Sequence, residues 1–269
     1  EAGEGERALL ALKEAEAAVG EEDPEDAATR HYLLARAHLL LGNPGLALEE
    51  IRKALALEEE SGHKAYGTPL VEGQALLQLG RYEEAMASFR EALARADAGE
   101  RPHVLHEMGV AALGHGAYPE AEEHLRALVR EEGYPYLAQA YADLAEALYR
   151  QGRYQEAEAA AREAVARGAV AAGELVLGHV AYDLLHLEEA LEHYRKAAES
   201  AEEGSREWVG AQEMVVDTLA QLGYRFPEEM VRRGQAVLPY LHPADEWHAA
   251  LTAYVERAQA LLREGKRLN

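Results

Sequence analysis

The chain contains no cysteine, so disulfide bonds, thiolate metal sites and thiol nucleophiles are excluded. Strand-forming residues are also scarce, since Ile51 is the only isoleucine and only four of the 269 residues are threonines. Sheets draw on branched and aromatic side chains, whereas alanine and straight-chain residues lose little rotamer freedom in a helix. No apolar run approaches the roughly 18 residues of a membrane-spanning helix. These absences predict an all-α protein without membrane insertion.

Basic residues are few relative to acidic ones: the chain has 49 acidic and 27 basic residues, and its formal net charge is −22. A field of that sign repels nucleic acid and anionic lipid, so proteins that clamp either along their length are excluded as a class. Asparagine is rare and arginine greatly outnumbers lysine, so we expect a bacterial, thermophilic source. Because the chain begins with Glu1 rather than methionine, a cleaved signal peptide is an alternative to the cytoplasmic location that we expect.

One alanine recurs along the chain with neighbours at fixed offsets. These anchor alanines are Ala8, Ala47, Ala85, Ala121, Ala157 and Ala190. Four residues after them stand Leu12, Ile51, Phe89, Leu125, Ala161 and Tyr194. Twelve residues before the last five stand Ala35, Gly73, Gly109, Ala145 and Gly178. Residues four apart share one face of a helix, so each anchor starts an apolar stripe, and the small residues let a preceding helix approach that stripe closely.

A glycine five residues before each anchor predicts a turn between two helices. The position holds Gly3, Gly42, Gly80, Gly116 and Gly152, and Leu185 is the one exception. Glycine just past a helix end supplies the left-handed conformation that closes the helix. Successive anchors are 33 to 39 residues apart, near the period of about 34 that is typical of helix–turn–helix repeats. The pattern predicts a solenoid of stacked helix pairs.

Four segments resemble the turn and second-helix start of a tetratricopeptide repeat (TPR). They are GRYEEA at 80–85, GRYQEA at 152–157, GAYPEA at 116–121 and, more loosely, LHLEEA at 185–190. The resemblance covers about residues 2 to 204 and implies an all-α, right-handed α–α superhelix of about five to six helix pairs.

The expected array occupies residues 1–204 and begins with a half-repeat, a lone second helix over 4–19. Five helix pairs follow at about 24–60, 67–97, 102–132, 137–167 and 172–203. The expected second region, 205–269, is continuous with the array. It holds a degenerate sixth pair at 207–222 and 228–238 and a capping helix at 244–263. That helix carries Trp247, Ala250, Leu251, Tyr254, Ala258 and Leu261 on one face.

The resemblance also implies a function, which is to bind a protein or peptide segment in a concave groove lined by the first helices. Carried over from the groove positions of the family, the candidate partner-binding residues are Tyr32, Arg36, Gln74, Gln78, His103, His106, Gln139, Glu146, Tyr149, Arg150, His179, Tyr182 and Asp183. Tyrosine and arginine suit such a surface because they give much contact area and often dominate binding energy. The positions that clamp a carboxylate in chaperone-binding members differ here, so we expect another specificity.

We expect no enzyme, no metal and no cofactor. His103 and His106 lie one helical turn apart with Glu107 beside them, but a dedicated metal site needs more ligands than the sequence places nearby. The sequence contains no phosphate-binding glycine loop, dinucleotide fingerprint, HExxH or GxSxG motif. Two alternatives to a binding scaffold stay open. One is a sensor or regulatory module whose output domain lies outside this sequence, and the other is a scaffold that self-assembles end to end.

Overall fold

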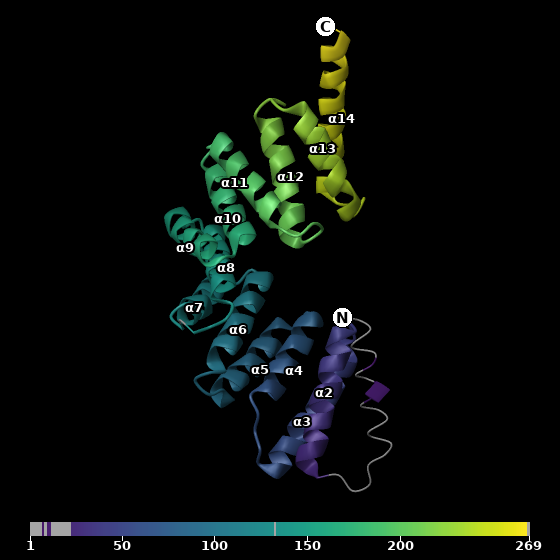
Figure 1. Cartoon of the computed structure of the whole chain (residues 1–269). Helices are drawn as coiled ribbons and strands as arrows, with labels where there is room; N and C mark the ends of the chain where they lie inside the picture. Colours follow the sequence, from purple (N-terminus) through teal and green to yellow (C-terminus); the bar gives the residue numbers. More distant parts are fainter. Residues whose placement is uncertain (1–6, 8–9, 12–22, 132, 268–269) are drawn as a thin grey trace. The chain divides into compact units, whose positions relative to one another are not determined.

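The computed structural model describes residues 7, 10–11, 23–131 and 133–267 (Figure 1). This part of the chain contains thirteen α-helices and one short 3-10 helix, and no β-strand. The half-repeat predicted over 4–19 lies outside the described residues except at positions 7, 10 and 11. The chain divides into two compact units, residues 1–128 and 129–269, which we call the N-terminal and C-terminal units. The change of pattern expected at residue 205 concerns the sequence and stays a prediction.

The N-terminal unit consists of three described helix pairs. The pairs are α2 (Pro24–Leu40) with α3 (Pro44–Ser61), α4 (Gly67–Gln78) with α5 (Tyr82–Arg95), and α6 (Arg101–His115) with α7 (Tyr118–Leu128). Each helix packs on the next one along the chain. The predicted pairs are confirmed to within a few residues. Asp23 caps α2 by accepting a hydrogen bond from the backbone N–H of Glu25 at 3.0 Å, as acidic N-caps do.

The C-terminal unit continues the same arrangement. Its helices are α8 (Leu137–Arg150), α9 (Tyr154–Arg167), α10 (Val170–Asp183), α11 (Leu187–Ser200), α12 (Arg206–Gln221), α13 (Pro227–Val237), the 3-10 helix η1 (Leu238–Tyr240) and α14 (Glu246–Arg267). The last helix packs on α13 and α12. Its buried stripe is Leu251, Val255 and Ala258, whereas Trp247 is 43% exposed. Trp247 stands in the first turn of α14, so the buried part of this face begins at Leu251.

The turns inside the pairs share one backbone geometry. At Gly80 the backbone φ is +73°, and the N–H of Arg81 donates to the carbonyl of Leu76 at 2.8 Å. Leu185 stands at the corresponding position of the α10–α11 pair with φ +62°, and the N–H of His186 donates to the carbonyl of Ala181 at 2.8 Å. A leucine thus adopts the left-handed conformation that glycine supplies elsewhere.

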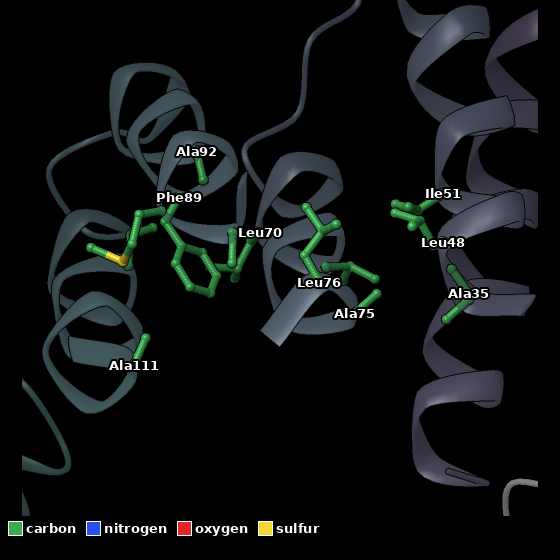
Figure 2. Close-up of a cluster of buried hydrophobic side chains, with 14 of the residues drawn as sticks. Ala35, Leu48, Ile51, Leu70, Ala75, Leu76, Phe89, Ala92 and Ala111 are labelled. Carbon is green, nitrogen blue, oxygen red and sulfur yellow. The ribbon is translucent and has the colours of Figure 1, made fainter. Parts of the chain in front are cut away.

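Within a pair, small residues on the first helix accommodate large ones on the second. A Cβ atom placed on Gly73 of α4 would lie 2.4 Å from the Phe89 ring of α5, and one on Gly178 would lie 2.5 Å from the Tyr194 ring. Both rings are fully buried, and Figure 2 shows Phe89 pointing between its neighbouring helices. The anchor alanines that the structure describes are fully buried too: Ala47, Ala85, Ala121, Ala157 and Ala190. The predicted close approach of paired helices is confirmed.

Candidate functional site

A groove of about 860 Å³ opens on the N-terminal unit, between α2, α4 and the first turn of α6. One of its walls is the loop of residues 62–66, which joins α3 to α4. Four of the sequence-predicted residues line the groove, namely Tyr32, Arg36, Gln74 and His103. The structure gathers these side chains from three successive first helices because repeated helix pairs present the same face of each first helix.

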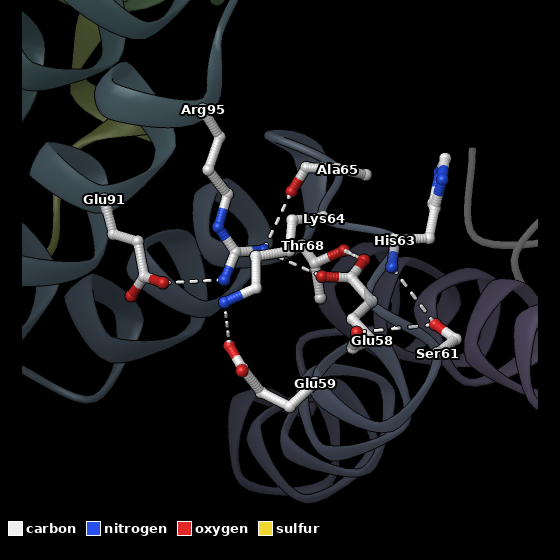
Figure 3. A network of polar contacts seen from close by, with 9 residues as sticks. All are labelled: Glu58, Glu59, Ser61, His63, Lys64, Ala65, Thr68, Glu91 and Arg95. Carbon is white, nitrogen blue, oxygen red and sulfur yellow. Dashed lines mark hydrogen bonds and ion pairs between the residues drawn. The ribbon is translucent and has the colours of Figure 1, made fainter.

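A buried ion pair holds the loop wall (Figure 3). Glu58 on the last turn of α3 and Arg95 at the end of α5 approach to 2.7 Å, with side chains 7% and 8% exposed. Thr68 donates a hydrogen bond to the Glu58 carboxylate, and the Arg95 guanidinium donates to the carbonyl oxygen of Ala65 at 3.1 Å. A buried charge is stable only when it is paired and hydrogen-bonded, so these contacts tie the loop to both helices.

Arg36 supplies an exposed cation to the groove. Its guanidinium carbon lies 5.7 Å from the centre of the Tyr32 ring, and a contact of this kind orients the charge. It forms no ion pair with any residue that the structure describes. Burial, followed by the charge of Glu100, raises the pKa of Tyr66 on the loop wall. That phenol therefore stays protonated at neutral pH and is able to donate a hydrogen bond.

Gln78 and His106 lie outside the groove. Gln78 ends α4 one turn beyond Gln74, with an exposed side chain, and His106 stands one turn beyond His103 on α6. Each follows a groove residue on the same helix but does not line the hollow. The structure therefore does not bring these two predicted residues together with the other four.

In the C-terminal unit the structure gathers a second group of predicted residues on α8 and α10. The rings of Tyr149 and His179 stack with their centroids 5.4 Å apart, and the Tyr149 hydroxyl is hydrogen-bonded to Asp183. Glu146 and Arg150, one turn apart on α8, form an ion pair of 2.6 Å. Burial lowers the pKa of His179, so that this ring is neutral at pH 7.

Gln139 and Tyr182 make other contacts. Gln139 donates to Asp143 on its own helix at 2.9 Å. The Tyr182 hydroxyl donates to Asp217 of α12, whose second oxygen accepts from Tyr254 of α14 at 3.2 Å. Asp217 is 5% exposed, so this carboxylate ties α14 to α12 and is closed to a partner.

Sequence reasoning missed Asp217 and the pair of Glu58 and Arg95. The hydrogen bond between Tyr182 and Asp217 spans 35 residues, which is about one repeat. A search for tyrosine and aspartate at that spacing would have found it. Glu58 and Arg95 are 37 residues apart at the ends of two second helices, and nothing in the surrounding sequence distinguishes them from the many exposed acids and arginines.

The structure describes both histidines weighed above as metal ligands, His103 and His106. Within the described residues, no three His, Asp or Glu side chains come together in an arrangement that could hold a metal ion. None of the helices that the structure describes is long and apolar enough to span a bilayer.

Two family models match the chain, and both are described as tetratricopeptide repeats. One matches residues 106–172 and the other matches residues 28–61 and 71–98. Among curated proteins no relative matches the chain.

Several solved structures have the same fold at low sequence identity. The pilF protein of Pseudomonas aeruginosa is 16% identical with a TM-score of 0.66, over 86% of this chain and 99% of that one. The C-terminal part of a TPR repeat-containing protein from Cytophaga hutchinsonii is 15% identical with a TM-score of 0.60, over 92% and 94%. A thermophilic TPR protein from Thermus thermophilus is 22% identical with a TM-score of 0.53, over 73% of this chain and 100% of that one. These likenesses concern the fold.

Proposed function

Because the chain carries tetratricopeptide repeats, we propose that it is a non-enzymatic interaction protein that binds a segment of another protein in the groove of its N-terminal unit. Repeats of this kind generally mediate contacts between proteins, and a solenoid uses an extended concave surface for them. The observation that carries the proposal is the open groove, which is lined by an aromatic ring, an amide, an imidazole and an exposed guanidinium from three helix pairs.

The mechanism that we propose is docking onto a surface formed in advance. The ion pair of Glu58 and Arg95 holds the loop wall, and Tyr32 orients the guanidinium of Arg36. Side chains that are already held in place lose less conformational entropy when a partner arrives, so more of the contact energy appears as affinity. Gln74 and His103 add hydrogen-bonding groups that select a register of the bound segment.

Affinity capture with a matched pair of variants tests this proposal. The full chain is immobilised and exposed to lysate of the native organism, and the retained proteins are quantified by mass spectrometry. The groove variant combines Arg36→Ala with Gln74→Ala. We expect at least one protein to be retained by the wild type and to fall about tenfold or more in the variant, since anchor residues contribute about 2 kcal/mol or more.

The control variant combines Arg90→Ala with Gln78→Ala. It removes the same residue types from the same unit, but both side chains are exposed and neither lines the groove. We expect it to retain the wild-type set, with an unchanged helical circular dichroism signal in all three proteins. Equal losses in both variants, or no loss in the groove variant, would refute binding in the groove.

A further inference from the structure

A cluster of rings and one carboxylate lies on the C-terminal unit and shares no residue with the groove. It consists of Tyr149 of α8, Tyr154 of α9, and His179 and Asp183 of α10. The Tyr149 ring has its centroid 5.4 Å from that of His179 and 6.1 Å from that of Tyr154. Tyr154 donates its hydroxyl to Asp183 at 3.1 Å, and Tyr149 is hydrogen-bonded to the same carboxylate. Three helices thus place aromatic faces around one acid.

The carboxylate of Asp183 is exposed. It makes no ion pair with any residue in the described part of the chain. The nearby imidazole does not compensate it, because burial lowers the pKa of His179 and leaves the ring neutral. The nearest arginine along α8, Arg150, is held by Glu146 at 2.6 Å. The two tyrosines orient the carboxylate but leave its charge in place.

A second acid in the same unit shows what a closed version of this arrangement looks like. Asp217 also accepts hydrogen bonds from two tyrosines, Tyr182 and Tyr254, but Tyr254 belongs to α14, which packs on α12. Asp217 is buried, whereas Asp183 is open to solvent. Each of the two carboxylates therefore accepts hydrogen bonds from two tyrosines, but only that of Asp183 is accessible to solvent.

Two buried polar atoms next to the cluster also lack a hydrogen-bond partner among the described residues. The hydroxyl of Tyr194 and the Nδ1 atom of His179 are buried and have no hydrogen-bond partner among the described residues. Their rings lie with centroids 5.6 Å apart. Native interiors rarely leave such atoms unsatisfied, so buried polar atoms without a partner among the described residues border the cluster.

We propose that this cluster, Tyr149, Tyr154, His179 and Asp183, binds an arginine side chain of a partner protein. A planar guanidinium stacks on a tyrosine face and at the same time pairs with a carboxylate through two parallel hydrogen bonds. The net charge of −22 adds long-range attraction for a basic segment. The site lies on the C-terminal unit and does not rest on the groove proposed above.

A peptide titration tests the inference on the full chain. The probes are a short capped peptide with one central arginine and the same peptide with citrulline, which has a similar shape but no charge. Tyrosine ring signals are followed by NMR, and those of Tyr149 and Tyr154 are assigned with Tyr→Phe variants. We expect the arginine peptide to shift both rings saturably. The citrulline peptide should bind at least about tenfold more weakly, because charge-assisted hydrogen bonds are much stronger than neutral ones.

Substitution then locates the site. Asp183→Asn preserves the size of the side chain and should weaken the arginine peptide about tenfold. Glu199→Gln removes one exposed carboxylate of α11 and should leave the affinity within about twofold, as expected for a distant charge screened by salt. The groove variant, Arg36→Ala with Gln74→Ala, should bind the peptide like the wild type, so that failure of the groove proposal and failure of this one are told apart.

Three results would overturn the inference. The first is equal binding of the arginine and citrulline peptides to the wild type, a comparison that needs no variant to fold. The second is an equal loss in Asp183→Asn and Glu199→Gln, which indicates attraction to the general negative field. The third is retention of full affinity in Asp183→Asn while its tryptophan fluorescence and circular dichroism match the wild type.

Discussion

Replacing Leu185 by glycine should stabilise the C-terminal unit, although it removes a large apolar side chain. Leu185 has φ +62° and is 80% exposed, so it buries little apolar surface. The left-handed conformation costs an L-residue about 1–2 kcal/mol, which glycine avoids. Glycine in turn loses about 0.5–1 kcal/mol more backbone entropy on folding. The difference predicts that Leu185→Gly raises the free energy of unfolding by about 0.5–1 kcal/mol.

Urea unfolding followed by tryptophan fluorescence measures this gain. The two tryptophans of the chain, Trp208 and Trp247, both belong to the C-terminal unit, so their emission reports on the unit that carries the substitution. With a urea m value of about 1–3 kcal/mol/M, the midpoint should rise by about 0.2–1 M while m stays constant. If the unfolding curve measured by far-ultraviolet circular dichroism coincides with the fluorescence curve, one cooperative transition is observed.

The adjacent leucine provides the control. Leu184 is also exposed, but its φ is −81°, where glycine offers no conformational advantage. Leu184→Gly should therefore lower the free energy of unfolding by about 0.5–1 kcal/mol. If Leu185→Gly is as stable as the wild type or less stable, or if both substitutions change stability by the same amount, the assignment of strain to residue 185 is wrong.

Two further predictions concern packing and charge. Gly73→Ala should cost about 1–3 kcal/mol because its Cβ meets the Phe89 ring at 2.4 Å. A double-mutant cycle with Phe89→Leu should then show a coupling of about 1 kcal/mol or more, and additive effects would contradict the contact. Burial alone would raise the pKa of Glu229, but hydrogen bonds from Arg195 and Arg233 lower it below the ordinary 4.5. The stability that this carboxylate contributes is thus present above pH 4.5 and lost as the pH falls through its folded pKa. Glu229→Gln should destabilise by about 1–3 kcal/mol at pH 7 and progressively less below pH 4.5, and a constant difference in urea midpoint would contradict this.

The helix pairs could be predicted because the small-residue positions and the helix-closing glycines act locally. Gly80 closes its helix through bonds to the preceding turn, and Gly73 meets the ring of Phe89 only sixteen residues further on. Such relations recur from one helix pair to the next and can be recognised in a single sequence. Leu185 shows that the repeat dictates backbone geometry even where the side chain opposes it, since hydrogen bonds at the same positions impose φ +62° on a leucine.

The candidate sites could be predicted only in part, because they depend on contacts between neighbouring repeats. Family positions indicated which side chains face outward from the first helices, and the structure places Arg36 and Gln74 in one groove. They did not indicate whether an acid such as Asp183 stays open or, like Asp217, is closed by a tyrosine from α14. That difference arises where the array meets its last helix. In a chain of repeats with equivalent positions, the packing of the following helices therefore decides which of two similar carboxylates remains able to receive a partner.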